Sequence, residues 1–249
     1  MNRLLAEPLR PRAALVLATA RVRIGSVEAA LAQRLQREGL VQAVTEGWQV
    51  KAPADEALEA IARWLANNGL AGRWRNELLD VTDEQGNAVA AIERAAVRPL
   101  GIKTFAVHLI GVRRDGAVWV QQRALDKATD PGLWDTTMGG QIGAGETVVQ
   151  ALERETWEEA GLRLVQLSGV AFFERFEIRR PVVEGYMIEQ IDVYAAQLPD
   201  AAVPVNRDGE VQRFDCLPPA ELSARLAAHS FTFEAAAILS AWLAQGAIK

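Results

Sequence analysis

The sequence has little of the residues and segments that mark several common protein classes. It holds one cysteine, Cys216, among 249 residues, so no disulfide can form within the chain, and a reducing cytoplasm is the expected location. No apolar run approaches the roughly 18 residues that span a bilayer. The 27 basic residues are fewer than the 32 acidic ones, so the chain lacks the basic field typical of nucleic-acid or anionic-membrane binding. We therefore expect a globular protein with neither nucleic acid nor membrane as a partner.

Half of the residues are hydrophobic and 24% are charged, a composition that excludes an intrinsically disordered chain. The length fits either one large domain or two small ones. The apolar run AALVLATA at residues 13–20, which follows Arg10 and Arg12, has the outline of a secretory signal. Because this run is short, contains Thr19 and leads into Arg21, we expect an ordinary strand or a packed N-terminal segment.

Residues 1–99 predict a smaller α+β domain. Ser26 is the expected N-cap of a first helix, which Gly39 would end. Apolar residues at helical spacing predict a second helix over residues 54–68. Two apolar runs around Gly86-Asn87 predict a hairpin.

Residues 100–249 predict a second domain in which strands and helices alternate. Such an order is typical of an α/β/α sandwich with a mixed sheet, so the chain as a whole is expected to be α+β. The expected strands are residues 104–112, 117–124, 164–177, 186–197 and 210–217, and the expected helices are residues 147–160, a segment after Pro218-Pro219, and residues 232–244.

The residues that suggest chemistry lie in GGQIGAGETVVQALERETWEEAGL, residues 139–162, which we call the motif segment. On a helix, Glu155, Glu158 and Glu159 are related by steps of three and four residues and share one face. Three carboxylates so placed repel one another unless a cation lies between them. A hard divalent cation such as Mg²⁺ binds oxygen ligands of this kind. Charged helical faces are usually only solvated, but the spacing of the whole segment favours a site.

The segment also contains a possible carboxylate partner and several glycines. Arg154 precedes Glu158 by one helical turn and can orient a carboxylate through a bidentate hydrogen bond. The glycines allow the backbone to turn sharply into the helix and to approach a ligand closely; they are Gly139, Gly140, Gly143 and Gly145. The predicted geometry is therefore a glycine-rich loop that leads into an acidic helix.

The segment from Gly140 to Leu162 resembles the signature of the Nudix hydrolases, G-x5-E-x7-R-E-U-x-E-E-x-G-U, in which U is a bulky aliphatic residue. Every charged and glycine position agrees. Thr156 departs from the pattern at the first U position, where we expect a weaker packing contact and no effect on a ligand.

The resemblance implies that a diphosphate linkage in a small molecule is hydrolysed with Mg²⁺ or Mn²⁺. It implies that Glu155, Glu158 and Glu159 bind the metal, and that Glu155 or Glu159, with Arg154, takes part in catalysis. It further implies that Gly140, Glu146 and Gly161 support the geometry of the loop and the helix.

An additional carboxylate from a late loop is implied by the same resemblance. Glu210 is the first candidate, since it follows a turn and opens a predicted strand, although a solvated loop glutamate would look the same. Glu184 and Glu189 are weaker candidates.

Four further residues have a binding interpretation beside a packing or solvated one. Trp134 could stack on a heteroaromatic ring or pack in the core, and Arg73 and Arg75 could reach a phosphate or be solvated. His108 lies in an apolar strand and is expected to be a hydrogen-bonded core residue.

A narrower resemblance rests on WRNEL at 74–78, IERAA at 92–96 and GIKTFAVHLIGV at 101–112. These segments are similar to a subgroup of Nudix proteins that carry an extra N-terminal domain and include fungal proteins linked to thiamine. The implied substrate is thiamine diphosphate or a damaged analogue, and the N-terminal domain would shape or cover the pocket.

Three alternatives stay open, and so does a homodimer. The substrate could be a nucleoside diphosphate sugar or another nucleotide. The chain could be a binding module that hydrolyses nothing, although such modules typically lose the glutamates. An enzyme like isopentenyl-diphosphate isomerase would need a cysteine in the pocket, and Cys216 is the only one.

Overall fold

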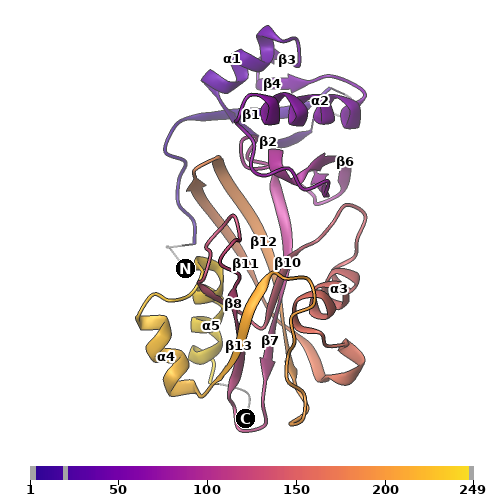
Figure 1. Cartoon of the computed structure of the whole chain (residues 1–249). Helices are drawn as coiled ribbons and strands as arrows, with labels where there is room; N and C mark the ends of the chain where they lie inside the picture. Colours follow the sequence, from indigo (N-terminus) through magenta and orange to yellow (C-terminus); the bar gives the residue numbers. More distant parts are fainter. Residues whose placement is uncertain (1–3, 19–21, 247–249) are drawn as a thin grey trace. The chain divides into compact units, whose positions relative to one another are not determined.

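The computed structural model describes residues 4–18 and 22–246 (Figure 1). The chain consists of two compact units. Unit 1 consists of Met1–Phe105, Gly143–Gly145 and Glu177–Gln190. Unit 2 consists of Ala106–Ile142, Glu146–Phe176 and Ile191–Lys249. Among the described residues, no helix combines the length and the apolar character that a membrane crossing requires.

Unit 1 contains a four-stranded sheet with the order β2-β1-β4-β3 and two helices. Its elements are β1 (Arg12–Leu17), β2 (Arg23–Glu28), α1 (Ala29–Arg37), β3 (Val41–Val44), β4 (Gly47–Val50) and α2 (Ala54–Asn67). The apolar faces of both helices join the sheet in one buried cluster, to which α1 contributes Leu35 and α2 contributes Leu58 and Ile61. Strand β1 lies in the run that outlined a secretory signal, and residues 19–21 at the end of that run fall outside the described residues.

The expected N-cap of the first helix was wrong. Ser26 belongs to β2, and the helix begins three residues later, at Ala29. Ser26 is buried, and its polar groups are already used: Oγ accepts a hydrogen bond from Arg12 Nε at 3.0 Å, and the amide donates to Leu100 O at 2.8 Å. Pairing with β1 thus overrides the capping preference of serine. The expected end is confirmed, since Gly39 has a φ of 69° just after the helix.

The second helix and the hairpin were predicted correctly. Helix α2 covers Ala54–Asn67, and β5 (Leu78–Thr82) pairs with β6 (Ala88–Glu93) around the turn. A 3₁₀ turn, η1 (Arg94–Ala96), follows. The short segment Gly143–Gly145 belongs to this unit because the Ala144 amide donates to Leu78 O at 2.8 Å and the Gly145 amide donates to Asp80 Oδ2 at 3.1 Å.

Unit 2 is built on the larger sheet, which has the strand order β11-β12-β7-β8-β13. Two short strands extend it, since β10 pairs with β7 and β9 pairs with β8. The strands are β7 (Lys103–Val112), β8 (Val118–Arg123), β9 (Trp134–Asp135), β10 (Met138–Gln141), β11 (Ser168–Val182), β12 (Gly185–Gln197) and β13 (Val211–Leu217). The division into units falls within β7, β11 and β12.

Three helices complete unit 2, namely α3 (Val148–Ala160), α4 (Pro219–Ala227) and α5 (Phe233–Ala244). Figure 1 shows α3 on one side of the sheet and α4 with α5 on the other, so the predicted α/β/α sandwich and the α+β class are confirmed. One strand was predicted too early: residues 164–166 form a 3₁₀ turn, η2 (Leu164–Gln166), and β11 begins at Ser168. The amide of Leu164 there donates to Glu153 Oε2 rather than to a neighbouring strand.

Helix α3 has well-defined ends that follow from its sequence. Thr147 is the N-cap, with Oγ1 accepting from the Gln150 amide while Gln150 Oε1 accepts from the Thr147 amide, which is a capping box. Gly161 ends the helix with a φ of 65°, a left-handed conformation that glycine adopts without strain. Ala151 and Leu152 pack with Met138 in the core of unit 2.

Thr156 gives a testable consequence of its departure from the aliphatic pattern. Its side chain is fully buried, and its hydroxyl finds no hydrogen-bond partner among the described residues. Thr156→Val keeps the shape and removes the unpaired hydroxyl, so we expect the free energy of unfolding to rise by about 1 kcal/mol and the Tm to rise by about 2–4 °C.

The matched control is Thr147→Val, which makes the same chemical change at the cap of the same helix. It should lower the free energy of unfolding by about 1 kcal/mol. Calorimetric melting of both variants checks the pair, and a lower Tm for Thr156→Val would contradict the assignment.

Candidate functional site

Two glycines of β10 bring that strand into close contact with its neighbours. A Cβ built on Gly140 would overlap the carboxylate of Glu155, and a Cβ on Gly139 would overlap the ring of His108. Glycine at 140 therefore gives the Glu155 carboxylate of α3 its place against the strand. This contact explains why that position of the motif segment cannot carry a side chain.

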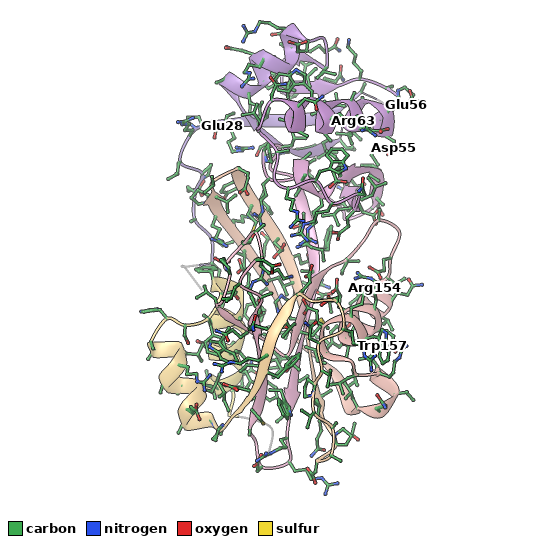
Figure 2. The ribbon with its side chains drawn as sticks, viewed as in Figure 1. Glu28, Asp55, Glu56, Arg63, Arg154 and Trp157 are labelled. Carbon is green, nitrogen blue, oxygen red and sulfur yellow. The ribbon has the colours of Figure 1, made fainter. Side chains whose placement is uncertain are left out.

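Arg154 organises the acidic side chains at the start of the site. Its Nε and Nη2 donate to the two carboxylate oxygens of Glu146, both at 2.8 Å, in a bidentate pair. Its Nη1 donates to Glu155 Oε1 at 2.7 Å and to Glu158 Oε2 at 3.2 Å. Figure 2 shows Arg154 projecting from α3. The Glu146 carboxylate raises the pKa of Arg154, so this cation stays charged.

Glu155 is largely buried, which is costly for its charge. Burial raises the pKa of Glu155 to about 7, although the charge and the hydrogen bond of Arg154 oppose that shift. The nearby charges of Glu158 and Glu210 raise the pKa further. A carboxyl group with such a pKa can gain or lose a proton near neutral pH.

Glu159 is almost completely enclosed. Its Oε2 accepts hydrogen bonds from the Gly139 amide at 3.0 Å and from Gln121 Nε2 at 2.8 Å. Burial, followed by the charge of Glu155, raises the pKa of Glu159 to about 8, against the opposing effect of Lys127. The site therefore contains a deeply buried carboxylate whose charged form is destabilised unless a cation is near.

A loop before β13 brings two further carboxylates to Glu159. One carboxylate oxygen each of Glu159, Asp208 and Glu210 lie within 4.8 Å of one another. The ammonium group of Lys127 bonds to Glu210. Partial burial, with the charge of Glu210 as a smaller cause, raises the pKa of Asp208.

Oxygen donors alone make up this group, which is the donor set that hard divalent cations prefer. A second observation agrees. Gln121 is buried, its Nε2 is used by Glu159, and its Oε1 has no hydrogen-bond partner among the described residues. A buried acceptor beside three carboxylates fits a site that takes a cation with its bound water. The residues present thus fit a divalent metal.

The three helical glutamates share one helix as expected, and the charge of Glu155 acts on Glu159. Glu155 and Glu158 are both held by Arg154, and Glu158 is the more exposed of the two. Glu159 also lies beside two carboxylates of the loop, Asp208 and Glu210. Of these, Glu210 was expected and Asp208 was missed. Asp208 stands two residues before Glu210 in the same turn, and that spacing was the available signal.

The other carboxylate and arginine candidates belong to unit 1. Glu184 forms an ion pair with Arg98 at 3.6 Å, and Glu189 is buried and accepts from Thr104 Oγ1; both belong to unit 1. Arg73, which is exposed, and Arg75, which is half-buried, belong to the same unit.

Trp134 and His108 are both buried. Trp134 is 6% exposed, and the guanidinium groups of Arg213 and Arg225 lie 5.2 and 4.9 Å from its ring centroid. His108 is a hydrogen-bonded core residue, as expected, with Nδ1 2.9 Å from Thr136 Oγ1. Both side chains therefore already have protein groups around them.

Cys216 lies in β13 opposite Trp119 of β8 and is half-buried. Burial raises the pKa of its thiol, and the charges of Arg113 and Asp115 in the β7–β8 turn act on it. A raised pKa makes the thiol less reactive at neutral pH.

The comparisons with known proteins show the family of this chain. The family model described as NUDIX domain matches residues 103–237, more than half of the chain. Two plant proteins, Nudix hydrolase 24, chloroplastic, and Nudix hydrolase 20, chloroplastic, both of Arabidopsis thaliana, are 34% identical over 179 residues and 31% identical over 202 residues. These alignments cover 67% and 76% of this chain, and 47% and 52% of the plant proteins. The chain thus spans about half the length of these relatives.

A solved structure supports the fold. The crystal structure of DR0079 from Deinococcus radiodurans matches with a TM-score of 0.52 and 24% sequence identity, covering 63% of this chain and 92% of that one. Isopentenyl-diphosphate Delta-isomerases are also among the sequence matches, at 28% and 31% identity.

Burial of Glu159 predicts how stability depends on pH in the metal-free protein. Its folded pKa is about 8, above the ordinary value of 4.5, so between these values the folded state holds the proton more tightly than the unfolded state. Stability contributed by this group is therefore lost as pH rises through the folded pKa. Glu159→Gln removes the penalty, and we expect it to raise the free energy of unfolding at pH 8.5 by roughly 1–3 kcal/mol, with a smaller gain at pH 5.

Urea unfolding with a chelator present, at both pH values, measures this difference. The control Glu84→Gln, in the exposed turn between β5 and β6, should show no such dependence on pH. A Glu159→Gln variant that is less stable than wild type at pH 8.5 would show that the carboxylate is not under strain.

Proposed function

This chain belongs to the Nudix family, and we propose that it is a pyrophosphohydrolase that cleaves a diphosphate linkage with the help of a divalent metal. The observation that carries the proposal is the meeting of Glu159 with Asp208 and Glu210, next to the glutamates that Arg154 holds. Nudix enzymes bind small diphosphate substrates, so a small molecule is the expected partner.

The metal is Mg²⁺ or Mn²⁺ in this proposal, with Glu155, Glu158 and Glu159 as the expected ligands and with Asp208 and Glu210 adding carboxylates beside Glu159. When bound, such an ion neutralises diphosphate oxygens and lowers the pKa of a coordinated water.

The chain's own residues orient these groups and move the proton. Arg154 fixes the Glu155 and Glu158 carboxylates by its hydrogen bonds, and the Gly139 amide fixes Glu159. Glu155, whose pKa is near 7, is the group best suited to take up a proton at neutral pH. Glu210, bonded to Lys127, is the second candidate for that role.

For the substrate we propose thiamine diphosphate or its oxidised or damaged analogues, cleaved to the monophosphate and phosphate. The support is the resemblance of the segments at 74–78, 92–96 and 101–112 to the thiamine-linked subgroup. A nucleoside diphosphate sugar or another nucleotide diphosphate is the alternative. A cytoplasmic location is supported by the single cysteine alone.

We also propose a division of labour between an N-terminal domain, residues 1–99, and a Nudix domain, residues 100–249, in which the first shapes the substrate pocket. The support is that the amides of Ala144 and Gly145, which directly precede Glu146 in the chain, bond to β5. Asp80, which accepts from Gly145, is the side chain to change in testing this.

A panel of diphosphates tests the reaction and the substrate together. We expect phosphate and thiamine monophosphate release with Mg²⁺ from thiamine diphosphate or its oxidised forms. Glu158→Gln and Glu159→Gln should each lower kcat by at least a hundredfold, about 2.7 kcal/mol of transition-state stabilisation. Asp80→Ala should raise KM and leave kcat nearly unchanged.

The outcomes separate the claims. Turnover of nucleotides but of no thiamine compound would reject the substrate, and unchanged hydrolysis in both glutamine variants would reject the metal site. Cys216→Ser should leave activity intact, because a loss would favour isomerase-type chemistry instead.

A further inference from the structure

The loop that carries Asp208 and Glu210 is attached to the end of α3. The amide of Val205 donates to Ala160 O at 2.8 Å, and the amide of Arg207 donates to Glu158 O at 3.1 Å. These are carbonyl groups of the last turn of α3, which lack partners within a helix. The loop thus completes the helix terminus that carries Glu158 and Glu159.

Two guanidinium groups lie against the ring of Trp157, a residue of α3 that is labelled in Figure 2. The central carbon of Arg207 lies 3.9 Å from the ring centroid, and that of Arg163 lies 3.7 Å from it. Since one ring face has room for one guanidinium at such a distance, the two cations lie on opposite faces. Arg207 comes from the loop, whereas Arg163 follows α3 directly and also pairs with Glu153. The two arginines therefore make the same contact, but only one of them holds the loop.

Gly161 allows the loop to come this close. A Cβ at this position would meet Val205 O at 2.7 Å and Arg207 Nε at 3.0 Å. This glycine of the motif segment therefore has two functions: it ends α3 in a left-handed conformation, and it leaves room for the loop.

Hydrogen bonds within the loop connect Arg207 and Glu210 through their neighbours. Asn206 Oδ1 accepts from the amides of Asp208 and Gly209 at 3.2 and 3.1 Å, and Asp208 Oδ1 accepts from the Glu210 amide at 2.8 Å. At its far end, Glu210 O accepts from the Ala124 amide at 2.9 Å. A displacement of Arg207 would therefore be passed on to both carboxylates.

We propose that Arg207, stacked on Trp157, is a positioning residue that holds Asp208 and Glu210 beside Glu159. The inference deepens the proposed function, because it assigns the assembly of the metal-binding carboxylates to a contact outside the acidic group. It also predicts a change in metal affinity opposite to the one expected from charge alone. A cation near a metal site repels the metal, so removing its charge alone would strengthen metal binding, whereas loss of positioning weakens it.

Titration of the full chain with Mn²⁺, followed by electron paramagnetic resonance of the free ion, tests the proposal. We expect Arg207→Leu to weaken Mn²⁺ binding about fivefold, in line with the loss of one cation–π contact by an exposed arginine. The matched control Arg163→Leu removes the cation on the other face of the ring and should stay within about twofold of wild type. Equal or tighter binding by Arg207→Leu would overturn the proposal.

A double-mutant comparison identifies the contact. In a Trp157→Leu background, Arg207→Leu should cause no further loss of Mn²⁺ affinity, because the two changes remove one interaction. Additive losses would show that Arg207 acts through something other than the ring. Arg207→Lys should restore little, since an ammonium group lacks the planar stacking surface of guanidinium.

Hydrogen exchange on the metal-free protein separates this proposal from the proposed function. Arg207→Leu should speed exchange of the amides at positions 205 and 207 about tenfold, after correction for the intrinsic rate at position 207, and leave the Ala151 amide of α3 unchanged. A uniform increase at all three would indicate a general loss of stability and reject positioning. If the wild type binds no Mn²⁺, the proposed function fails, while the exchange comparison still decides the role of Arg207.

Discussion

One guanidinium group, that of Arg154, forms ion pairs with three carboxylates of the site. Arg154 binds Glu146 with two hydrogen bonds and reaches Glu155 and Glu158 with its remaining nitrogen. On a bare helix, glutamates at this spacing would repel one another and be driven into solvent. Arg154 offsets this repulsion for Glu155 and Glu158, which the helical repeat places on one face of α3. The glycine at 140 then lets that face meet the strand.

Burial of Glu159 destabilises its charged form. It is buried, and its pKa is raised to about 8, yet it lies where the loop carboxylates meet it. Lys127 and the hydrogen bonds from Gly139 and Gln121 offset only part of that burial cost. Sites that hold unfavourable charge before a ligand binds are typical of enzymes, in which stability is exchanged for binding. The carboxylates of the site and the groups that offset their repulsion therefore all belong to unit 2.

Much of this arrangement could be predicted from residue spacing. The helix, its cap at Thr147 and its end at Gly161 follow from local rules, and the spacing of the glutamates placed them on one face. Ser26 was misplaced because pairing of β2 with β1 is a long-range contact that capping rules ignore. Asp208 was missed for a similar reason. Its proximity to Glu159 depends on how a loop folds back onto the helix, and the signal in the sequence was only its place two residues before Glu210.

The central claim is that helix and loop carboxylates form one cation site. Asp208→Asn tests it most directly, because it keeps the size of the side chain and the Oδ1 acceptor for the Glu210 amide while removing the charge. Calorimetric titration with Mn²⁺ should show affinity at least tenfold lower than in the wild type at pH 8. Unchanged affinity would contradict the account, because the ion would then be held without the loop.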